Sequence, residues 1–257
     1  MIKLLSNTTA KDIPIVGIKA GYLGELKAAG FNVPDGFVIT ADSKATYESD
    51  VMSHFDELGK DYVAVRSSPA PCETDKSVCV GQLESKMWVR RWELMDAIAD
   101  CKNSLGSRKV EMYMLRKGIT KSIPLAVLIH EMVESSSAGV ISTVRGSDTS
   151  AMVINACFGA GHAVVSGREV PDCYIIDRKS GEIIDEKIKP QKEQINRAGW
   201  SQVKPDLRKK RKLSDGQIEK IVETAKQIEK YFGTAQDIEF CFDNEELWIL
   251  QTNPILP

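Results

Sequence analysis

The stretch DIEFCFDNEELWILQTNP, residues 237–254, decides the fold of this chain. Apolar residues alternate with acidic residues and a cysteine over residues 237–242, which predicts a β-strand buried on one face. A turn formed by residues 243–245 would return the chain into a second strand over residues 247–251. The stretch therefore predicts a β-hairpin that carries acidic and amide side chains at fixed positions.

The polar side chains of this hairpin are expected to share one face. With a three-residue loop, Asp237 lies opposite Gln251, and Glu239 and Asn253 fall on the same face. Carboxylate and amide oxygens suit Mg²⁺, which takes one or two protein ligands and completes its shell with phosphates and water. The hairpin is therefore either part of a magnesium site or a solvated edge strand rich in acidic residues, and the spacing alone leaves both open.

The composition is that of an ordinary soluble globular protein. The 257 residues can bury a core as one large domain or as two lobes. The net charge of −2 predicts no general affinity for nucleic acid, and no apolar run has the length of a signal-peptide core or a membrane span. The six cysteines form no CxxC pair and the three histidines are far apart, so we predict reduced thiols, no zinc set and a cytoplasmic location.

Two cations in the first third of the chain are candidates for binding phosphate. Residues 13–40 predict a glycine-bearing loop, a helix that ends at Gly30, and a strand. Lys19 lies at the start of that helix, where the backbone amides and the dipole favour an anion. Arg66 directly follows the predicted strand 62–65, where its guanidinium can bind phosphate through two parallel hydrogen bonds. A solvated surface cation is the alternative at each position.

The rest of the chain supplies further elements and one change of composition. Gly81 interrupts an alternating run, which predicts either a close backbone approach to a ligand or an ordinary bulge. The segment 190–212 ends in RKKRK and is interpreted as a solvated linker rather than a nucleic-acid site. The remaining expected elements are helices over 92–115 and 214–232, a central strand over 123–133, a strand and glycine loop over 152–167, and a strand pair over 174–188.

Nine sequence blocks, taken in order, resemble the nucleotide-binding domain of the phosphoenolpyruvate synthase and pyruvate phosphate dikinase family, which rifampicin phosphotransferase shares. The blocks run from about residue 15 to residue 254 and are GIKAGYLGEL, VPDGFVIT, AVRSSPAP, VGQLES, HEMVESSSAGVISTV, FGAGHAVVSG with PD, QIEKYFG, QDIEF and ILQTNP. The resemblance implies an α+β fold of the two-lobed ATP-grasp type, with an N-terminal lobe over residues 1–130 and a C-terminal lobe over 131–257.

The resemblance also implies roles for individual residues, with ATP and Mg²⁺ as the cofactors. Lys19 and Arg66 match the catalytic pair that binds the phosphates. The remaining matches are Gly81 and Gln82 in the phosphate loop, Glu131, Met132 and Val133 in the segment whose backbone reads adenine, and Asp237, Glu239 and Gln251 as Mg²⁺-ATP ligands. Such a site works by positioning and by neutralising the charge that spreads over the transferred phosphate.

The sequence departs from the family pattern at two blocks. Asn253 stands where the family has an arginine near the terminal phosphates, and His162 stands in GAGH where a carboxylate is usual. The family passes phosphate through a histidine in a TxxGGxxSH-like block on a swivelling domain, and this sequence contains no such block. The chain is therefore expected to be a catalytic fragment or a stand-alone subunit.

Three functions fit these observations. The first is an ATP-dependent phosphotransferase domain that serves a phosphohistidine partner, supplied in trans or by a part of the chain not given. The second is a stand-alone ATP-grasp kinase or ligase acting on a small molecule. The third is a nucleotide-binding regulator with impaired turnover, which the replacement at Asn253 and His162 would explain. None of the three requires nucleic acid or a membrane.

Overall fold

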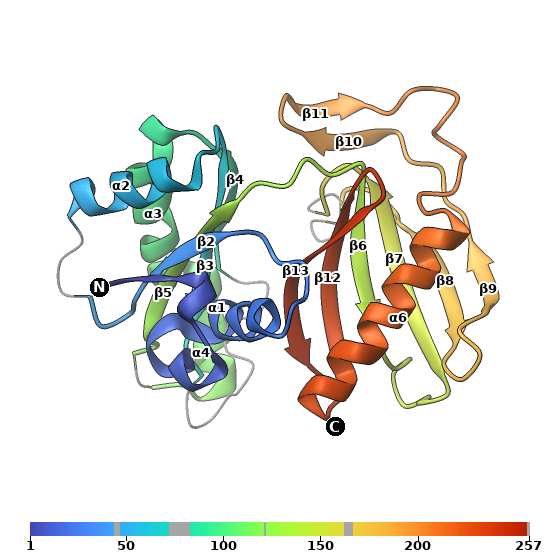
Figure 1. Ribbon diagram of the computed structural model, residues 1–257, viewed down its shortest axis with the longest axis horizontal. Coiled ribbons are helices and arrows are strands. Elements are labelled where there is room, and N and C mark those ends of the chain that lie inside the picture. The colour runs from blue at the N-terminus through green and yellow to red at the C-terminus, as the bar shows by residue number, and fades with distance from the viewer. Residues whose placement is uncertain (44–46, 72–82, 121, 162–166, 256–257) are drawn as a thin grey trace. The chain divides into compact units, whose positions relative to one another are not determined.

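The computed structural model describes residues 1–43, 47–71, 83–120, 122–161 and 167–255. These residues form two compact units, Met1–Met132 and Val133–Pro257. Each unit combines helices with an antiparallel sheet (Figure 1), so the predicted α+β class is confirmed. No helix within the described residues combines the length and the apolar character that a membrane span requires.

Unit 1, residues 1–132, is built on a five-stranded antiparallel sheet with the order β1-β2-β5-β3-β4. The central strand β5 lies between β2 and β3, and its five middle residues are buried, which confirms the central strand predicted over 123–133. The strands are β1 (Ile2–Leu4), β2 (Gly36–Ile39), β3 (Val63–Pro69), β4 (Ser85–Val89) and β5 (Leu125–Glu131).

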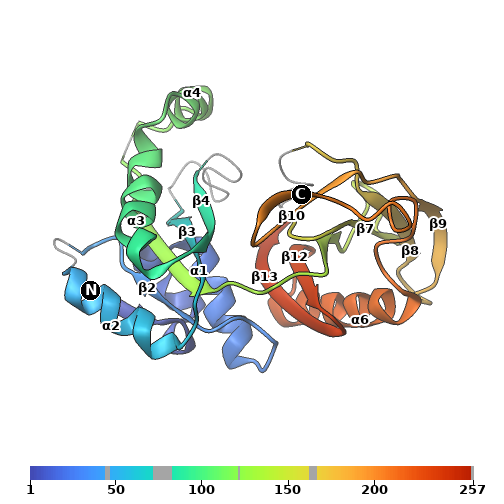
Figure 2. The ribbon, with the colours of Figure 1, turned by 90° about the horizontal axis from the view of Figure 1, so that it is seen from above.

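Helices cover both faces of this sheet. The helices α2 and α3 lie on one face (Figure 2). There Val63, Val65, Val127 and Ile129 belong to a single buried cluster with side chains from both helices. On the other face, α1 packs on β3 and β5. The helices are α1 (Ile13–Ala28), α2 (Glu48–Leu58), α3 (Leu94–Asn103) and α4 (Arg108–Lys117), with short 3₁₀ turns η1 (Leu5–Asn7), η2 (Ala10–Asp12), η3 (Arg91–Glu93) and η4 (Ser104–Gly106).

The single helix predicted over 92–115 is two helices. The helix α3 ends at Asn103, the turn η4 follows, and α4 begins after Ser107. The Ser107 hydroxyl accepts a hydrogen bond from the amide of Val110 at 3.4 Å and so caps the second helix. Serine favours this cap position because its side chain satisfies an amide that the helix leaves without an internal partner, and the prediction missed that stop and restart.

Unit 2, residues 133–257, is built on a six-stranded antiparallel sheet with the order β13-β12-β6-β7-β8-β9. A separate two-stranded sheet is formed by β10 and β11. The strands are β6 (Ser137–Ser142), β7 (Ala151–Phe158), β8 (Asp172–Asp177), β9 (Ile183–Lys187), β10 (Glu193–Asn196), β11 (Gly199–Gln202), β12 (Gln236–Asp243) and β13 (Glu246–Pro254).

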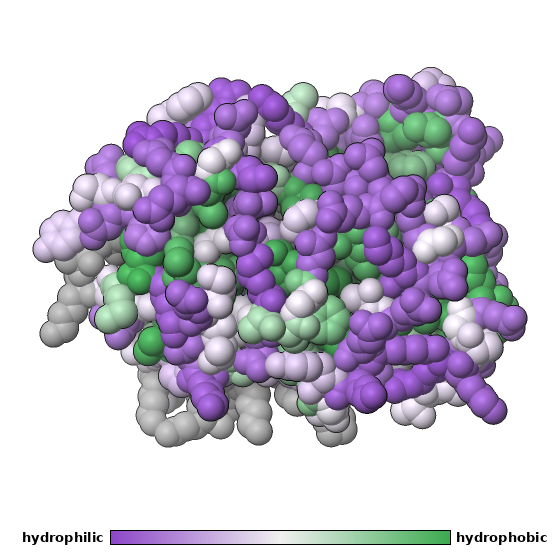
Figure 3. Space-filling model, viewed as in Figure 1, coloured by the Kyte–Doolittle hydropathy of each residue, from purple (hydrophilic) through white to green (hydrophobic). Residues whose placement is uncertain are grey.

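The helix α6 (Asp215–Phe232) runs along one face of the six-stranded sheet (Figure 1). Ser214 and Gln217 form a capping box at its start, and Gly233 ends it in the left-handed conformation. Its apolar buried stripe holds Ile218, Ile221, Val222, Ala225 and Ile228, whereas Phe232 is partly exposed. Charged residues occupy the outward side, and Figure 3 shows this surface as mostly hydrophilic.

The prediction that residues 190–212 form a solvated linker is partly wrong. The segment contains the β10–β11 hairpin, and three of its residues, Gln191, Val203 and Lys212, are buried. Lys212 at the end of the RKKRK run forms an ion pair with Asp172 at 2.8 Å. A lysine is buried only when a partner compensates its charge, and this partner lies 40 residues away in the sequence, so the local charge run gave no sign of it.

The cysteines of the described residues pack as the composition suggested. Cys101, Cys157, Cys173 and Cys241 are free thiols, and all but Cys173 are buried. Burial raises the pKa of the Cys241 thiol to about 12, because an apolar environment disfavours the thiolate. The Cys241 thiol is therefore a protonated packing group rather than a reactive one.

Gly17 divides α1 into two helical segments. Its φ of 77° and ψ of 169° are not helical, so the helix that carries Lys19 starts after it, as the predicted glycine loop requires. A Cβ atom at this position would overlap the carbonyl group of Ser68 in β3. Glycine is therefore required twice here, once for the backbone angle and once for the close approach of α1 to β3.

We expect Gly17→Ala to lower the free energy of unfolding of unit 1 by about 3 kcal/mol or more, because it adds a backbone clash to an unfavourable φ. The matched control is Gly59→Ala, where φ is 63° but no atom lies within 4 Å of the added Cβ. That control should cost only about 1 kcal/mol. Urea unfolding followed by circular dichroism measures both, and equal losses would show that the clash at Ser68 is absent.

Candidate functional site

Lys19 lies in the first turn of the second segment of α1 and reaches β3. Its ammonium group donates a hydrogen bond to the carbonyl of Ser67 at 2.9 Å. The next residue, Ala20, donates its backbone amide to the Ser68 hydroxyl at 3.2 Å. Ser67 and Ser68 are fully buried, and the Ser67 hydroxyl donates to the carbonyl of Cys101. The start of this helix is thus fixed on β3, and Lys19 is only partly buried.

Arg66 lies within β3, not after it. The prediction ended the strand at residue 65, but β3 continues to Pro69 because Arg66, Ser67 and Ser68 pair with β5. Pro69 fits the last position, where β3 no longer needs to donate an amide. Val63 and Val65 face the buried cluster with α2 and α3, so alternation puts Arg66 on the opposite face, which α1 covers. Lys19 contacts the residue next to Arg66, so the structure brings these two cations to neighbouring segments of unit 1.

The predicted adenine segment begins at the end of β5. The Glu131 amide donates to the carbonyl of Asp35 at 2.8 Å, and the Met132 amide donates to the carbonyl of Tyr62 at 3.2 Å. The Glu131 carboxylate lies 3.5 Å from the ammonium of Lys60. Since both of these backbone amides have partners within unit 1, an adenine base would have to use other backbone groups of residues 131–133.

His130 is a buried polar residue near Arg66 that was not predicted as a site residue. It is 4% exposed, and one ring nitrogen, Nδ1, lies 2.8 Å from the carbonyl of Glu131. The other nitrogen, Nε2, is buried without a hydrogen-bond partner among the described residues. Burial and the nearby charge of Arg66 lower the pKa of His130 to about 3, so the ring is neutral at physiological pH. The only feature of the sequence that could have singled out His130 was its position as a polar residue inside an otherwise apolar strand.

The hairpin of unit 2 forms, but its register differs from the predicted one. The turn contains two residues, Asn244 and Glu245, because Asn244 adopts the left-handed conformation with φ 53° that asparagine tolerates. A bulge between Glu239 and Phe240 then shifts the pairing once more. As a result Asp237 lies opposite Asn253, not Gln251.

The predicted polar face nevertheless survives both changes. Glu239 pairs with Gln251 and Asp237 with Asn253, so the four side chains share one face of the hairpin. Ile238, Phe240 and Phe242 are buried, as their alternation with the acidic residues requires. The strand β12 is flanked by β13 and β6, whereas β13, which carries Gln251 and Asn253, is the edge strand of the sheet.

The oxygen atoms of this face fit a hard cation. Asp237 accepts a hydrogen bond from the Ser142 hydroxyl of β6, and Asp237 and Glu239 are partly exposed while Gln251 is 4% exposed. Within the described residues, no three His, Cys, Asp or Glu side chains gather closely enough to hold a metal by themselves. Two carboxylates and an amide match the few protein ligands that Mg²⁺ takes when phosphates complete its shell.

Three of the predicted residues lie outside the described residues. These are Gly81 and Gln82 of the expected phosphate loop and His162 of the GAGH block.

A comparison with protein-family models gives one match that covers most of the chain. Residues 45–256 match the family described as the pyruvate phosphate dikinase AMP/ATP-binding domain. The chain belongs to this family. The predicted α+β class and the predicted family are thereby confirmed, whereas the division into nucleotide-holding lobes at residue 131 and the individual site residues stay predictions.

Relatives of this AMP/ATP-binding domain include phosphoenolpyruvate synthases. A probable phosphoenolpyruvate synthase of Archaeoglobus fulgidus is 30% identical over 308 residues, which cover 98% of this chain and 41% of the relative. A rifampicin phosphotransferase of Bacillus subtilis is 26% identical over 95% of this chain and 34% of its own length. A solved structure of D-alanine–D-alanine ligase from Bacillus anthracis aligns with a TM-score of 0.45 and 9% identity, over 96% of this chain and 58% of that one. Across three synthase relatives the chain spans between 26% and 44% of the relative's length.

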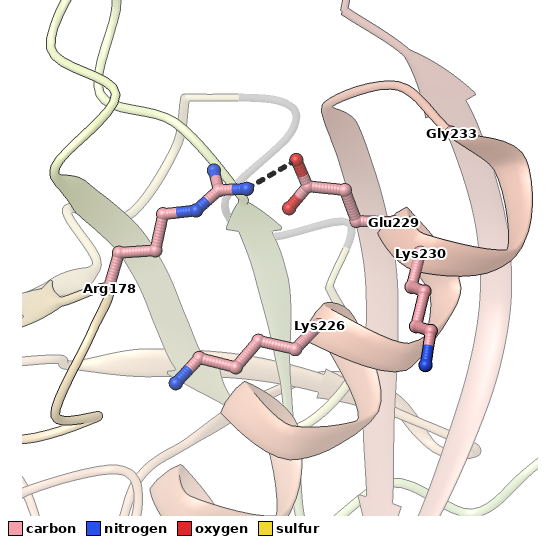
Figure 4. Close-up of a pocket in the computed structure, with 5 residues that line it drawn as sticks. All are labelled: Arg178, Lys226, Glu229, Lys230 and Gly233. Carbon is pink, nitrogen blue, oxygen red and sulfur yellow. Dashed lines mark hydrogen bonds and ion pairs between the residues drawn. The ribbon is translucent and has the colours of Figure 1, made fainter.

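A small pocket in unit 2 lies apart from the predicted residues of the AMP/ATP-binding domain. Its volume is about 320 Å³, and it is lined by Arg178, Lys226, Glu229, Lys230 and Gly233 (Figure 4). The Arg178 guanidinium donates to the Glu229 carboxylate at 2.6 Å and to the carbonyl of Thr143 at 2.8 Å. These contacts attach the last turns of α6 to the sheet, and none of the predicted site residues lines the pocket.

The buried His130 predicts a pH dependence of unit 1. Its folded-state pKa of about 3 lies below the ordinary value of 6.5, so the unfolded chain binds a proton between these values while the folded chain does not. Stability is then fully present above pH 6.5 and falls as the pH is lowered. Between pH 6.5 and 5.5, urea unfolding should show a loss of about 1 kcal/mol that His130→Gln removes.

The matched control for this measurement is His54→Gln, at a partly exposed histidine of α2. It should leave the pH dependence between 6.5 and 5.5 as it is in the unmodified chain. A pH dependence that is equally steep with and without His130 would show that this ring is protonated in the folded state.

Proposed function

We propose that this chain cleaves ATP and passes the phosphate to a histidine on a separate swivelling domain or partner. The observation that carries the proposal is the hairpin face of Asp237, Glu239, Gln251 and Asn253 in a chain of the AMP/ATP-binding family. Phosphoryl transfer needs positioning and charge neutralisation more than covalent chemistry by the protein, and the residues retained here are of those kinds.

In this proposal the two cations of unit 1 bind the phosphates of ATP. Lys19 extends from a helix start that is tied to β3, and Arg66 projects from that strand. A planar guanidinium can bind two phosphate oxygens at once, and an ammonium group adds a point charge. Both cations stabilise the negative charge that spreads over the phosphate oxygens as the bond to the leaving group breaks.

Asp237 and Glu239, with the Gln251 amide, would hold Mg²⁺ in unit 2. When bound, this ion would supply positive charge that offsets the negative charge of the phosphates. The Ser142 hydroxyl orients Asp237, and the pairing of β12 with both neighbours fixes the spacing of the two carboxylates. The backbone of Glu131, Met132 and Val133 would form hydrogen bonds with adenine. Gly81 and Gln82 would belong to the loop that binds the phosphates.

Analysis of the products distinguishes this function from the alternatives. The chain is incubated with ATP and Mg²⁺, with and without a histidine-bearing domain in trans, and ³¹P NMR identifies the nucleotide formed. AMP and inorganic phosphate that accumulate only when the histidine domain is present support the proposal, because one phosphoryl group goes to the histidine and the other to water. ADP formed with a small acceptor would indicate a kinase or ligase instead, and ATP binding without any turnover would indicate a regulator.

We expect Lys19→Ala and Glu239→Ala each to reduce turnover by about 100-fold or more, because each removes charge stabilisation that acts in the transition state. Both side chains are partly exposed, and in Lys19→Ala the hydrogen bond from the Ala20 amide to Ser68 still holds the helix start on β3, so folding should be little affected. The matched controls are Lys11→Ala and Glu219→Ala, at exposed positions of η2 and α6. Unchanged turnover in both site variants would overturn the assignment of these residues.

The regulator has one specific observation in its favour. Asn253 lies directly opposite Asp237, at the position where the resemblance expects an arginine. A cation there would act on the same phosphates as the metal, and its absence is expected to slow phosphoryl transfer by orders of magnitude unless another cation replaces it.

Asn253→Arg tests this point. If the site is impaired by the missing charge, the variant should raise the single-turnover rate of ATP cleavage by about tenfold or more. Gln227→Arg on the exposed side of α6 is the matched control for added positive charge and should change nothing. A rate that stays the same or falls in Asn253→Arg would show that the asparagine is adapted to the function of this chain.

A further inference from the structure

The pocket at the C-terminal end of α6 has a charge pattern that the proposed function does not use. Its lining includes three cations, Arg178, Lys226 and Lys230, and one carboxylate, that of Glu229 (Figure 4). Positive charge is therefore in excess. The volume of about 320 Å³ lies at the lower end of the range for ligand pockets, about 300–1,000 Å³, so the pocket suits a small anion rather than a nucleotide.

Arg178 is fixed in this pocket by the neighbouring chain and still has hydrogen-bond donors available. Its backbone amide donates to the carbonyl of Ser150 at 2.9 Å, and its guanidinium donates to the carbonyl of Thr143 at 2.8 Å and to Glu229 at 2.6 Å. A guanidinium has five N–H groups, so these two side-chain bonds leave others that can donate to a ligand. The side chain is 33% exposed, so a ligand can reach it.

Lys226 is partly buried, and its ammonium group forms neither a hydrogen bond nor an ion pair with any other described residue. The ammonium lies beside the turn between β8 and β9, because a Cβ atom on Gly181 would be 3.7 Å from Nζ. In Figure 4 the side chain extends from α6 toward the side of the pocket on which Arg178 lies. Burial of a charge is costly unless a partner compensates it, and an anion in the pocket would be such a partner.

The dipole of α6 accounts for only one of the three cations. Positive charge is stabilising in the last turn of a helix, and Lys230 lies in the last turn of α6. Lys226 lies about two turns before the C-cap Gly233, where this effect has faded. Arg178 comes from the turn that follows β8, not from the helix. The positive charge of the pocket is thus assembled from two elements, and the helix end does not explain it.

Glu229 determines which anion fits. Its side chain is 15% exposed, its Oε1 accepts from Arg178, and its other oxygen, Oε2, has no hydrogen-bond partner among the described residues. A carboxylate oxygen accepts hydrogen bonds and donates none. Hydrogen phosphate and hydroxyl-bearing phosphate monoesters have an O–H group that can donate to Oε2. Sulfate has no such group near neutral pH, so the carboxylate would repel it.

We propose that this pocket binds a small anion with a phosphate group, either hydrogen phosphate or a phosphate monoester that carries a hydroxyl group. The Arg178 guanidinium and the ammonium groups of Lys226 and Lys230 bind the phosphate oxygens, and Glu229 accepts the O–H group of the ligand. Guanidinium and ammonium groups both form charge-assisted hydrogen bonds with phosphate. The site is separate from the proposed ATP site, because none of the described residues predicted to bind ATP or Mg²⁺ lines the pocket.

The test titrates the full chain with inorganic phosphate, with glycerol 3-phosphate and with sulfate, at constant ionic strength and near neutral pH. The amide NMR signals of Gly181, beside the Lys226 ammonium, and of Gly233, in the pocket lining, report binding at this site. Their half-shift concentrations give the affinities. The phosphate compound that binds more tightly identifies the class of ligand, and sulfate should bind about tenfold more weakly than inorganic phosphate.

Lys226→Gln should weaken the binding of both phosphate compounds by about tenfold, because it removes one charge-assisted hydrogen bond to the anion. The matched control is Lys210→Gln, at an exposed lysine of unit 2 outside the pocket, which should leave the affinities within about twofold. Lys19→Ala should also leave them within about twofold, since Lys19 does not line the pocket. Glu229→Gln should raise the affinity for sulfate by about tenfold, because an amide replaces the carboxylate that repels it.

The absence of any shift at Gly181 and Gly233 with millimolar phosphate or glycerol 3-phosphate would overturn the inference. An equal loss of affinity in Lys210→Gln and Lys226→Gln would also overturn it, because it would show a general effect of net charge. Loss of the shifts in Lys19→Ala would assign the phosphate to the proposed ATP site instead. Equal binding of sulfate and phosphate by the unmodified chain would overturn the role of Glu229. Because the pocket needs no nucleotide, a chain that shows the shifts but does not cleave ATP supports this inference while the proposed function fails.

Discussion

The pairing of β12 on both sides is the constraint on which the site in unit 2 depends. Because β13 and β6 both bond to its backbone, β12 cannot slide or twist independently, and its side chains alternate between a buried face and a polar face. A shift of one residue would expose Ile238 and Phe240 and bury Asp237 and Glu239. The hydrophobic cost of that exchange, about 2 kcal/mol for each large side chain, fixes the position of the two carboxylates.

In unit 1 the corresponding constraint is the close approach of α1 to β3. Gly17 allows it, and two hydrogen bonds from Lys19 and Ala20 to the Ser67-Ser68 pair maintain it. The partner given to Lys19 by this contact is a backbone carbonyl, whose dipole orients the ammonium without cancelling its formal charge. The same segment of β3 carries Arg66, so one local packing arrangement positions both cations.

The sequence predicted the elements whose signals are local, and it failed where the decisive partner is distant. The hairpin of 237–254, its polar face, the central strand and the capped helix after Ser214 follow from alternation and from capping residues that lie within a few positions. The bulge at Glu239, the continuation of β3 through Arg66 and the burial of Lys212 depend on neighbouring strands or on Asp172. His130 belongs to the second group, since a lone polar residue in an apolar strand shows its role only when its neighbours are known.

The two units supply opposite kinds of charge, which agrees with the proposed function. Unit 1 contributes Lys19 and Arg66, which suit phosphate, while unit 2 contributes Asp237 and Glu239, which suit a metal ion. The Lys19 ammonium is oriented by the carbonyl of Ser67 and the Asp237 carboxylate by the hydroxyl of Ser142, and both partners are dipoles that leave the formal charge in place. An anion bound in unit 1 and a cation bound in unit 2 would each be stabilised by these side chains.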